Sequence, residues 1–292
     1  MSLEGMPRII VTGAGGMLGR DLLSALSGCD VYGLTHSDLD ITNVNLVARV
    51  FDDMRPDIVI HSAAYTDVDG CELDPDKAYR VNALGTRNVT VAANRVKCVM
   101  VYISTDYVFD GTKDSPYVEW DEPNPLNAYG MSKLLGEEFV RELSDRFYIV
   151  RTSWLYGRGG KNFVDTILKK AETEKSLRVV DDQRGSPTYT KDLASKIIEV
   201  IGLNKGLQMA GRVAGVSQRY GIYHITNSGY CSWYDLAREI VGNSIKVIPI
   251  KSTEIDRPAK RPKNSVLENR MLLLEGIGTL RPWKEALKDY TH

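Results

Sequence analysis

The 292-residue sequence lacks an excess of either charge: 37 lysine and arginine residues stand against 38 aspartate and glutamate residues, for a formal net charge of -1. No global field therefore favours a nucleic acid or an anionic membrane, and an anionic ligand must be held locally. The sequence also lacks a run of about 18 uninterrupted apolar residues, the length that a membrane span needs, and a basic segment followed by an apolar signal core. We expect no nucleic-acid or membrane partner.

Cysteine is scarce. The four cysteines, Cys29, Cys71, Cys98 and Cys231, lie far apart and without the spacing of metal ligands. A chain of 292 residues, 43% of them hydrophobic, is long enough to bury a core without disulfide bonds. We therefore predict reduced thiols and a cytoplasmic location. No cluster of acidic residues has metal-ligand spacing either, so we predict no metal site and leave the use of a divalent cation open.

Short apolar runs alternate with segments of helical periodicity between residues 8 and 153. This alternation is typical of repeated βαβ units and predicts an α/β fold with a doubly wound parallel sheet. Runs such as "DIVIHSAA" and "VMVYIST" are largely apolar throughout, as strands buried on both faces are. After residue 153 the rhythm changes, which predicts a smaller C-terminal α/β lobe.

Three glycines, Gly13, Gly16 and Gly19, stand three residues apart where the first apolar run gives way to a helical segment. Glycines there allow a tight turn and a close approach of the backbone to a pyrophosphate, which the first N–H groups of the helix bind. A plain glycine-rich turn is the alternative, but the position between first strand and first helix favours a nucleotide. We predict a Rossmann-type dinucleotide site.

The end of the second predicted strand has Thr35, His36 and Ser37 where an acidic residue often binds the adenosine ribose of NAD. Arg20 directly follows the last glycine and is placed to meet the 2′-phosphate of NADP, although a solvent-exposed helix arginine is an equal alternative. The pattern slightly favours NADPH and leaves NADH possible.

A tyrosine and a lysine, Tyr129 and Lys133, stand four residues apart in a segment of helical pattern, so they share one face. A nearby ammonium stabilises a phenolate and tunes the tyrosine as an acid or base. Two polar residues on a solvated face are the alternative. Just upstream, an apolar strand ends in Ser104 and Thr105, at the edge where doubly wound sheets bind ligands. We predict that Thr105 and Tyr129 together act on a substrate carbonyl.

Three motifs, "STDYVFDG", "YGMSKLLGE" and "RTSWLYG", follow one another in the sequence. With them the chain resembles the extended short-chain dehydrogenase/reductases, and more narrowly the dTDP-4-dehydrorhamnose reductases, over nearly its whole length. We expect a dinucleotide-binding domain over residues 6–153 plus about 188–226, and a substrate-binding lobe over about 154–187 plus 227–292.

The resemblance implies a cofactor site made from separate segments of the first domain. Lys133 would bind the nicotinamide ribose hydroxyls beside Tyr129. The other residues that it implies for the cofactor are Gly13, Gly16, Met17, Leu18 and Gly19 at the pyrophosphate, Asp40 and Ile41 at the adenine, and Ala63, Ala64 and Tyr65 near the second ribose.

The resemblance also implies a reaction. NAD(P)H would give hydride to C4 of dTDP-4-dehydro-6-deoxy-L-mannose, and the product would be dTDP-L-rhamnose. Tyr129 would supply the proton, Thr105 would polarise the carbonyl, and Lys133 would lower the pKa of the tyrosine. The implied substrate residues are Thr66, Val68, Thr105, Asp106, Tyr129 and Trp154, and Arg257 and Arg261 are candidate partners of the diphosphate.

Other functions stay open at this point. The non-catalytic regulatory subunit of methionine adenosyltransferase resembles these reductases and binds NADP without turnover, and a nucleotide-sugar 4-epimerase or another 4-reductase is a further alternative. Asp67 stands where the family usually has a small residue, which leaves the sugar and the nucleotide base open. The resemblance also suggests a homodimer.

Overall fold

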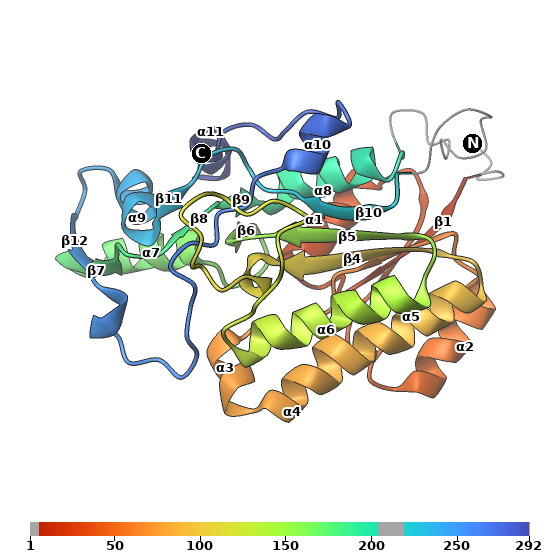
Figure 1. Ribbon diagram of the computed structural model, residues 1–292. Helices are drawn as coiled ribbons and strands as arrows, with labels where there is room; N and C mark the ends of the chain where they lie inside the picture. The colour runs from red at the N-terminus through yellow and green to blue at the C-terminus, as the bar shows by residue number, and fades with distance from the viewer. Residues whose placement is uncertain (1–5, 204–218, 292) are drawn as a thin grey trace.

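Six parallel strands form the central sheet, in the order β10-β5-β4-β3-β1-β2 (Figure 1). The computed structural model describes residues 6–203 and 219–291. The strands of this sheet are β1 (Arg8–Thr12), β2 (Asp30–Leu34), β3 (Ile58–His61), β4 (Val99–Thr105), β5 (Phe147–Thr152) and β10 (Gly221–His224). The order reverses direction between β1 and β3, as in doubly wound sheets, so the predicted fold class is confirmed.

The central strands are buried on both faces, which explains their continuous apolar character. Every residue of β3 and of β4 is buried. The edge strand β2 is only partly covered, and its sequence "DVYGL" is correspondingly less apolar. The pattern of apolar residues along each run therefore follows the position of the strand in the sheet.

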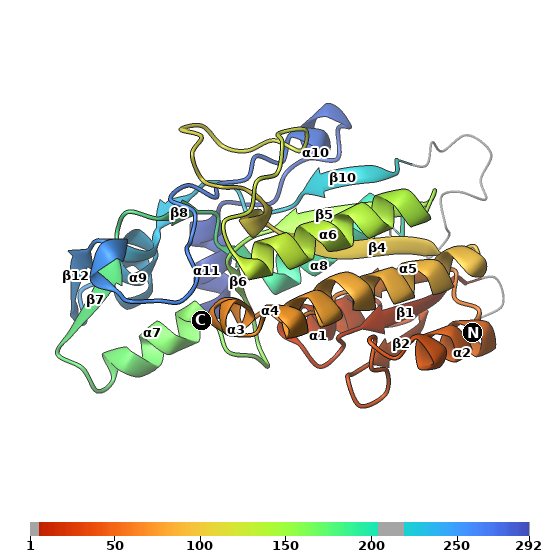
Figure 2. The same ribbon diagram turned by 60° about the horizontal axis from the view of Figure 1, so that its bottom comes forward.

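Helices cover both faces of the sheet (Figures 1 and 2). One face packs against α2 (Val44–Met54), α5 (Thr86–Arg95) and α6 (Ala128–Leu143) through a cluster that includes Phe51, Val89 and Val140. The other face packs against α1 (Met17–Ala25), α8 (Thr190–Val200) and α10 (Arg270–Leu274). Two hydrophobic layers thus fix the sheet and the loops at its carboxyl edge.

A second group of elements lies beyond the carboxyl ends of the strands (Figures 1 and 2). It comprises α7 (Phe163–Ala171), β7 (Ser176–Val180), α9 (Trp233–Val241), β12 (Lys246–Ile250) and α11 (Trp283–Thr291), and is called the small lobe below. β7 and β12 pair in parallel, and the lobe has apolar clusters of its own. The chain returns to the main sheet through α8 and β10 before completing the small lobe. The domain boundaries stay a prediction.

The remaining elements are short. They are α3 (Val68–Leu73), α4 (Pro75–Ala78), the π-helical segment η1 (Tyr79–Gly85), the 3-10 turns η2 (Asp106–Val108) and η3 (Ser252–Glu254), and the two-residue strands β6 (Leu155–Tyr156), β8 (Arg184–Gly185), β9 (Thr188–Tyr189) and β11 (Cys231–Ser232).

Within residues 6–203 and 219–291, no helix is both long and apolar enough to cross a bilayer. The same residues contain no group of three or more histidine, cysteine or acidic side chains placed to hold a metal ion.

Candidate active site

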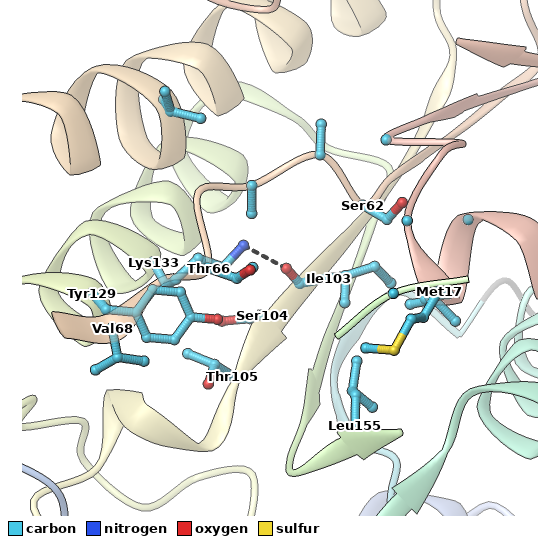
Figure 3. Close-up of a pocket in the computed structure, with 18 of the residues that line it drawn as sticks. Met17, Ser62, Thr66, Val68, Ile103, Ser104, Thr105, Tyr129, Lys133 and Leu155 are labelled. Carbon is cyan, nitrogen blue, oxygen red and sulfur yellow. Dashed lines mark hydrogen bonds between the residues drawn. The ribbon is translucent and has the colours of Figure 1, made fainter. Parts of the chain in front are cut away.

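A cavity of about 1090 Å³ lies at the carboxyl ends of the sheet strands, and most of the predicted site residues meet there (Figure 3). Small-molecule sites commonly measure about 300–1,000 Å³, so this volume suits a ligand as large as a dinucleotide. The predicted residues that line it are Gly13, Gly16, Met17, Leu18, Gly19, Asp40, Ile41, Ala63, Ala64, Thr66, Val68, Thr105, Asp106, Tyr129, Lys133 and Trp154. The residues predicted for the cofactor and those predicted for the substrate therefore share one cavity.

The glycine loop joins β1 to α1 and packs tightly against the neighbouring strand. Gly13 has a φ of +71°, in the left-handed region that favours glycine, and a Cβ there would lie 2.6 Å from the backbone nitrogen of Ala63. A Cβ at Gly19 would collide with the carbonyl oxygen of Gly13. Gly16 is the N-cap of α1, and the first N–H groups of a helix have no partner within the helix. The loop fits the pyrophosphate of a dinucleotide.

The far end of the cavity is lined by the turn after β2, including Thr35 and His36. The nearest acid in that turn, Asp38, accepts hydrogen bonds from the backbone nitrogen of Thr35 at 2.9 Å and from its hydroxyl at 2.6 Å. These bonds lower the pKa of Asp38, and its carboxylate is held within the turn. Asp40 is held in the same way by Thr42. Asp40 lines the cavity, and Asp38 is not among the residues that line it.

Tyr129 and Lys133 lie on the first turns of α6, whose N-cap is Asn127. The side chain of Asn127 accepts from the backbone nitrogen of Gly130 at 2.8 Å, which starts the helix at the required place. Lys133 donates from Nζ to the carbonyl oxygen of Ile103 at 2.6 Å (Figure 3). Its ammonium lies 4.1 Å from the ring centroid of Tyr102. A hydrogen bond therefore holds the lysine side chain at the carboxyl end of β4, near the tyrosine.

Burial dominates the electrostatics of this pair. It lowers the pKa of Lys133 to about 7, against the raising effect of the Glu137 carboxylate. It raises the pKa of Tyr129, against the lowering effect of a hydrogen bond with Thr105. Desolvation of the phenolate is the largest influence on the pKa of Tyr129, and the lowering effect of Lys133 stays a prediction. The phenol therefore keeps its proton near neutral pH.

The two hydroxyls at the end of β4 have different partners. Ser104 donates from Oγ to Glu137 Oε1 at 2.5 Å. Glu137 also accepts hydrogen bonds from Nε of Arg151 at 3.0 Å and from a terminal nitrogen of Arg151 at 2.7 Å. Both charged side chains are only 2% exposed. Ser104 is therefore committed to a buried ion pair, which leaves Thr105 as the strand-end hydroxyl for a substrate.

Two stacked indoles form one wall of the cavity. Trp154 and Trp233 both line it, with ring centroids 3.4 Å apart and planes inclined by 6°. Trp154 has a φ of +47°, a left-handed conformation that is costly for a bulky residue. Gly185 lies against its ring so closely that a Cβ there would collide with it. The wall is thus built from the residues between β5 and β6, from α9 and from β8, which are far apart in the sequence.

Comparison with known proteins identifies the family. The family described as "RmlD substrate binding domain" matches residues 7–292. This chain belongs to the RmlD family. A dTDP-4-dehydrorhamnose reductase of Aggregatibacter actinomycetemcomitans is 39% identical over 97% of this chain and 98% of its own length. The spore coat polysaccharide biosynthesis protein SpsK of Bacillus subtilis is 43% identical over 98% of this chain and 97% of its own length.

Solved structures of the RmlD family have the same fold. A dTDP-4-dehydrorhamnose reductase from Clostridium acetobutylicum superposes with a TM-score of 0.90 at 46% identity, covering 97% of this chain and 98% of that one. One from Bacillus anthracis, solved in complex with NADP, has a TM-score of 0.90 at 42% identity and covers 98% of each chain. The family resemblance expected from the sequence motifs is confirmed.

Four residues predicted for the RmlD site do not line the cavity: Arg20, Tyr65, Arg257 and Arg261. The backbone of Tyr65 is held by the side chain of Asn82, and its ring lies 4.3 Å from the ammonium of Lys77. Tyr65 thus supports the loop after β3 from outside, and its cofactor role stays a prediction.

The arginine loop predicted to bind a diphosphate lies against α3. Arg261 donates to both carboxylate oxygens of Asp69, at 3.0 and 2.8 Å, and its side chain is 11% exposed. The nearby Arg257 is exposed. Asp67, the unusual acid of this region, is the N-cap of α3 and accepts from the backbone nitrogen of Gly70 at 3.0 Å. Asp67 and Asp69 thus have structural partners, and the diphosphate role of the arginines stays a prediction.

Several cavity residues have no counterpart among the sequence predictions. The cations Lys77, Arg80 and Lys161 line the cavity from α4, η1 and the loop before α7. Trp233 completes the aromatic wall from α9. The four lie in segments that are far apart in the sequence, and the packing of those segments brings them to one cavity.

Arg20 is the residue through which we test the choice of cofactor. It donates from Nε to the carbonyl oxygen of Gly15, a cavity residue, at 3.0 Å. We expect Arg20→Ala to weaken NADPH binding by about 10–100-fold and NADH binding by much less, because a charged hydrogen bond to phosphate contributes about 1.5–3 kcal/mol. Fluorescence titration of each reduced cofactor measures the two constants. The exposed Arg141, on α6, provides Arg141→Ala as a control. Equal losses for the two cofactors would contradict the role.

Proposed function

We propose that this RmlD family member reduces the C4 keto group of dTDP-4-dehydro-6-deoxy-L-mannose to give dTDP-L-rhamnose, with NADPH as reductant and NADH as a possible substitute. The observation that carries the proposal is the meeting of the glycine loop, Thr105, Tyr129 and Lys133 in one cavity. Relatives that align over nearly the full chain are named dTDP-4-dehydrorhamnose reductases, and one was solved with NADP.

Different residues of the chain have different roles in such a reduction. The glycine loop holds the pyrophosphate, and Lys133 holds the nicotinamide ribose. Bound NADPH supplies the hydride for C4 of the sugar. The neutral phenol of Tyr129 then donates its proton to the oxygen at C4, while the hydroxyl of Thr105 stabilises the charge that develops there. Lys133 is 2% exposed and Tyr129 is partly buried, which limits the access of water to both.

The substrate would lie between the sheet and the small lobe. Trp154 and Trp233 offer an apolar wall for a sugar that lacks the hydroxyl at C6, and Thr66 and Val68 border the same space. In this proposal residues 154–187 and 227–292 are the substrate-binding lobe. A cytoplasmic location and a homodimer are parts of the proposal that rest on the sequence alone.

The test is a spectrophotometric assay. Purified protein is mixed with NADPH or NADH and enzymatically generated dTDP-4-dehydro-6-deoxy-L-mannose, and the loss of reduced-nicotinamide absorbance is followed. We expect turnover with the keto sugar and none with dTDP-D-glucose, which has no keto group at C4. Cofactor binding without turnover would contradict the enzyme and favour the regulatory function known from the subunit of methionine adenosyltransferase.

A further inference from the structure

The hydroxyl of Thr105 lies close to several polar groups. It accepts a hydrogen bond from the backbone nitrogen of Tyr107 at 3.2 Å and, beside an ionised carboxylate, donates from Oγ1 to Oδ1 of Asp106 at 3.0 Å. Tyr129 lines the same cavity, and Thr105 is among the groups that lower its pKa. A hydroxyl has one proton to donate and two lone pairs to accept with. The direction of the bond to Asp106 therefore decides what Thr105 can offer a substrate.

The direction follows from the charge of Asp106. An ionised carboxylate can only accept, so it takes the proton of Thr105, and the remaining lone pair of Thr105 attracts the proton of Tyr129. Neither hydroxyl then points its proton at a substrate carbonyl. A neutral carboxylic acid can instead donate to Thr105. The protons of Thr105 and Tyr129 are then both free for the substrate oxygen.

The surroundings of Asp106 favour the neutral form. Its side chain is 3% exposed, it lines the cavity, and its Oδ2 has no hydrogen-bond partner within the described part of the chain. The ionisable groups around it are Tyr107 on the same turn and Tyr129 on α6, with Lys133 farther along the cavity.

Arg257 and Arg261, on the loop that packs on α3, lower the pKa of Tyr107, the neighbour of Asp106. Burial raises the pKa of Asp106 to about 7, against the lowering effect of the Ser265 and Thr105 hydroxyls. The group therefore changes charge in the range where an enzyme works.

We propose that Asp106 is a positioning residue which, in its neutral form, donates to Thr105 and thereby turns the Thr105 hydroxyl toward the substrate carbonyl. This rests on the proposed reductase function. The carboxyl transfers no proton in the reaction; the proton that reaches the sugar oxygen comes from Tyr129. Turnover should accordingly need the carboxylic acid and fall as it ionises.

The test compares pH profiles of kcat in Asp106 variants. Without substitution, kcat should fall by about 50-fold between about pH 7 and pH 9, the loss expected for a single group that ionises near 7. Asp106→Asn should lower kcat several-fold near pH 6 but remove most of this fall, because an amide nitrogen can donate to Thr105 at every pH. Asp106→Leu, which has no donor, should lower kcat about 10–100-fold at all pH values with a smaller change in KM.

Asp114→Asn is the matched control, since Asp114 is exposed and lies in the same segment between β4 and α6. Its profile should match that of the unsubstituted protein. A fall that persists in Asp106→Asn would assign the ionisation to another group, such as Lys133, and overturn the proposal.

A second measurement separates this inference from the proposed function. Infrared difference spectra of the unsubstituted protein and Asp106→Asn should show a carboxylic acid C=O band near pH 6 that is lost by about pH 9. This band requires no turnover. Its presence without reductase activity would contradict the reductase alone, and its absence near pH 6 would overturn the role of Asp106.

Discussion

Replacement of Tyr129 by phenylalanine is expected to lower kcat by about 10²–10⁴-fold and to leave NADPH binding nearly unchanged. The substitution removes only the phenolic oxygen, which donates the proton in the proposed reaction, and the benefit of such general acid catalysis has this size. The ring still fills its place beside Tyr107, with which it makes an edge contact at 5.9 Å. Steady-state kinetics and fluorescence titration of the cofactor measure the two effects.

Tyr148→Phe is the control for this substitution. Tyr148 is also a buried tyrosine, but it lies on β5 and does not line the cavity. Loss of the Tyr148 hydroxyl should leave kcat nearly unchanged. Turnover by Tyr129→Phe at a rate close to that of the unsubstituted protein would remove Tyr129 from the mechanism, whatever the control does.

Replacement of Arg151 by methionine is expected to lower the free energy of unfolding by about 3–5 kcal/mol. Arg151 is the cationic partner of Glu137, and both side chains are 2% exposed. Without it, the carboxylate keeps only the hydroxyl of Ser104 as a side-chain partner in the described residues, and an uncompensated buried charge has a cost of this size. Urea denaturation measures the change through the midpoint and slope of unfolding.

The double substitution Arg151→Met with Glu137→Leu separates the lost charge from the lost volume. It should recover most of the stability, because no charge is then left buried. Arg270→Ala provides the exposed counterpart: its pair with Glu268 has side chains 48% and 36% exposed and should contribute less than about 1 kcal/mol. If Arg151→Met were as mild as Arg270→Ala, the buried pair would not be a principal support of β4, β5 and α6.

Features that depend on neighbouring residues could be predicted from the sequence. The alternation of strands and helices predicts the sheet, because each βαβ unit is a local pattern. Gly13 and Gly19 allow a tight turn that the spacing alone indicates, and the four-residue separation of Tyr129 and Lys133 places both on one face of α6. These parts of the site follow from periodicity and backbone geometry.

Features that depend on contacts between distant segments could not be predicted. The sequence makes Arg261 a candidate partner of the substrate diphosphate, and it does not show that the fold pairs Arg261 with Asp69, 192 residues earlier in the chain. Trp233 reaches the cavity only because α9 packs beside the end of β5. The pKa of Lys133 depends on how deeply α6 is buried, and the charge of Glu137 one turn later only partly offsets that burial. No local pattern contains this information.

The stacked pair of Trp154 and Trp233 has an optical consequence. Parallel indoles in contact share their excited state, so their absorption and circular dichroism differ from those of isolated tryptophans. The other two tryptophans, Trp120 and Trp283, are not part of this pair. Because the pair forms a wall of the cavity, a ligand that shifts one ring against the other changes the near-ultraviolet spectrum. The protein thus has a built-in chromophore that reports on the cavity without any added label.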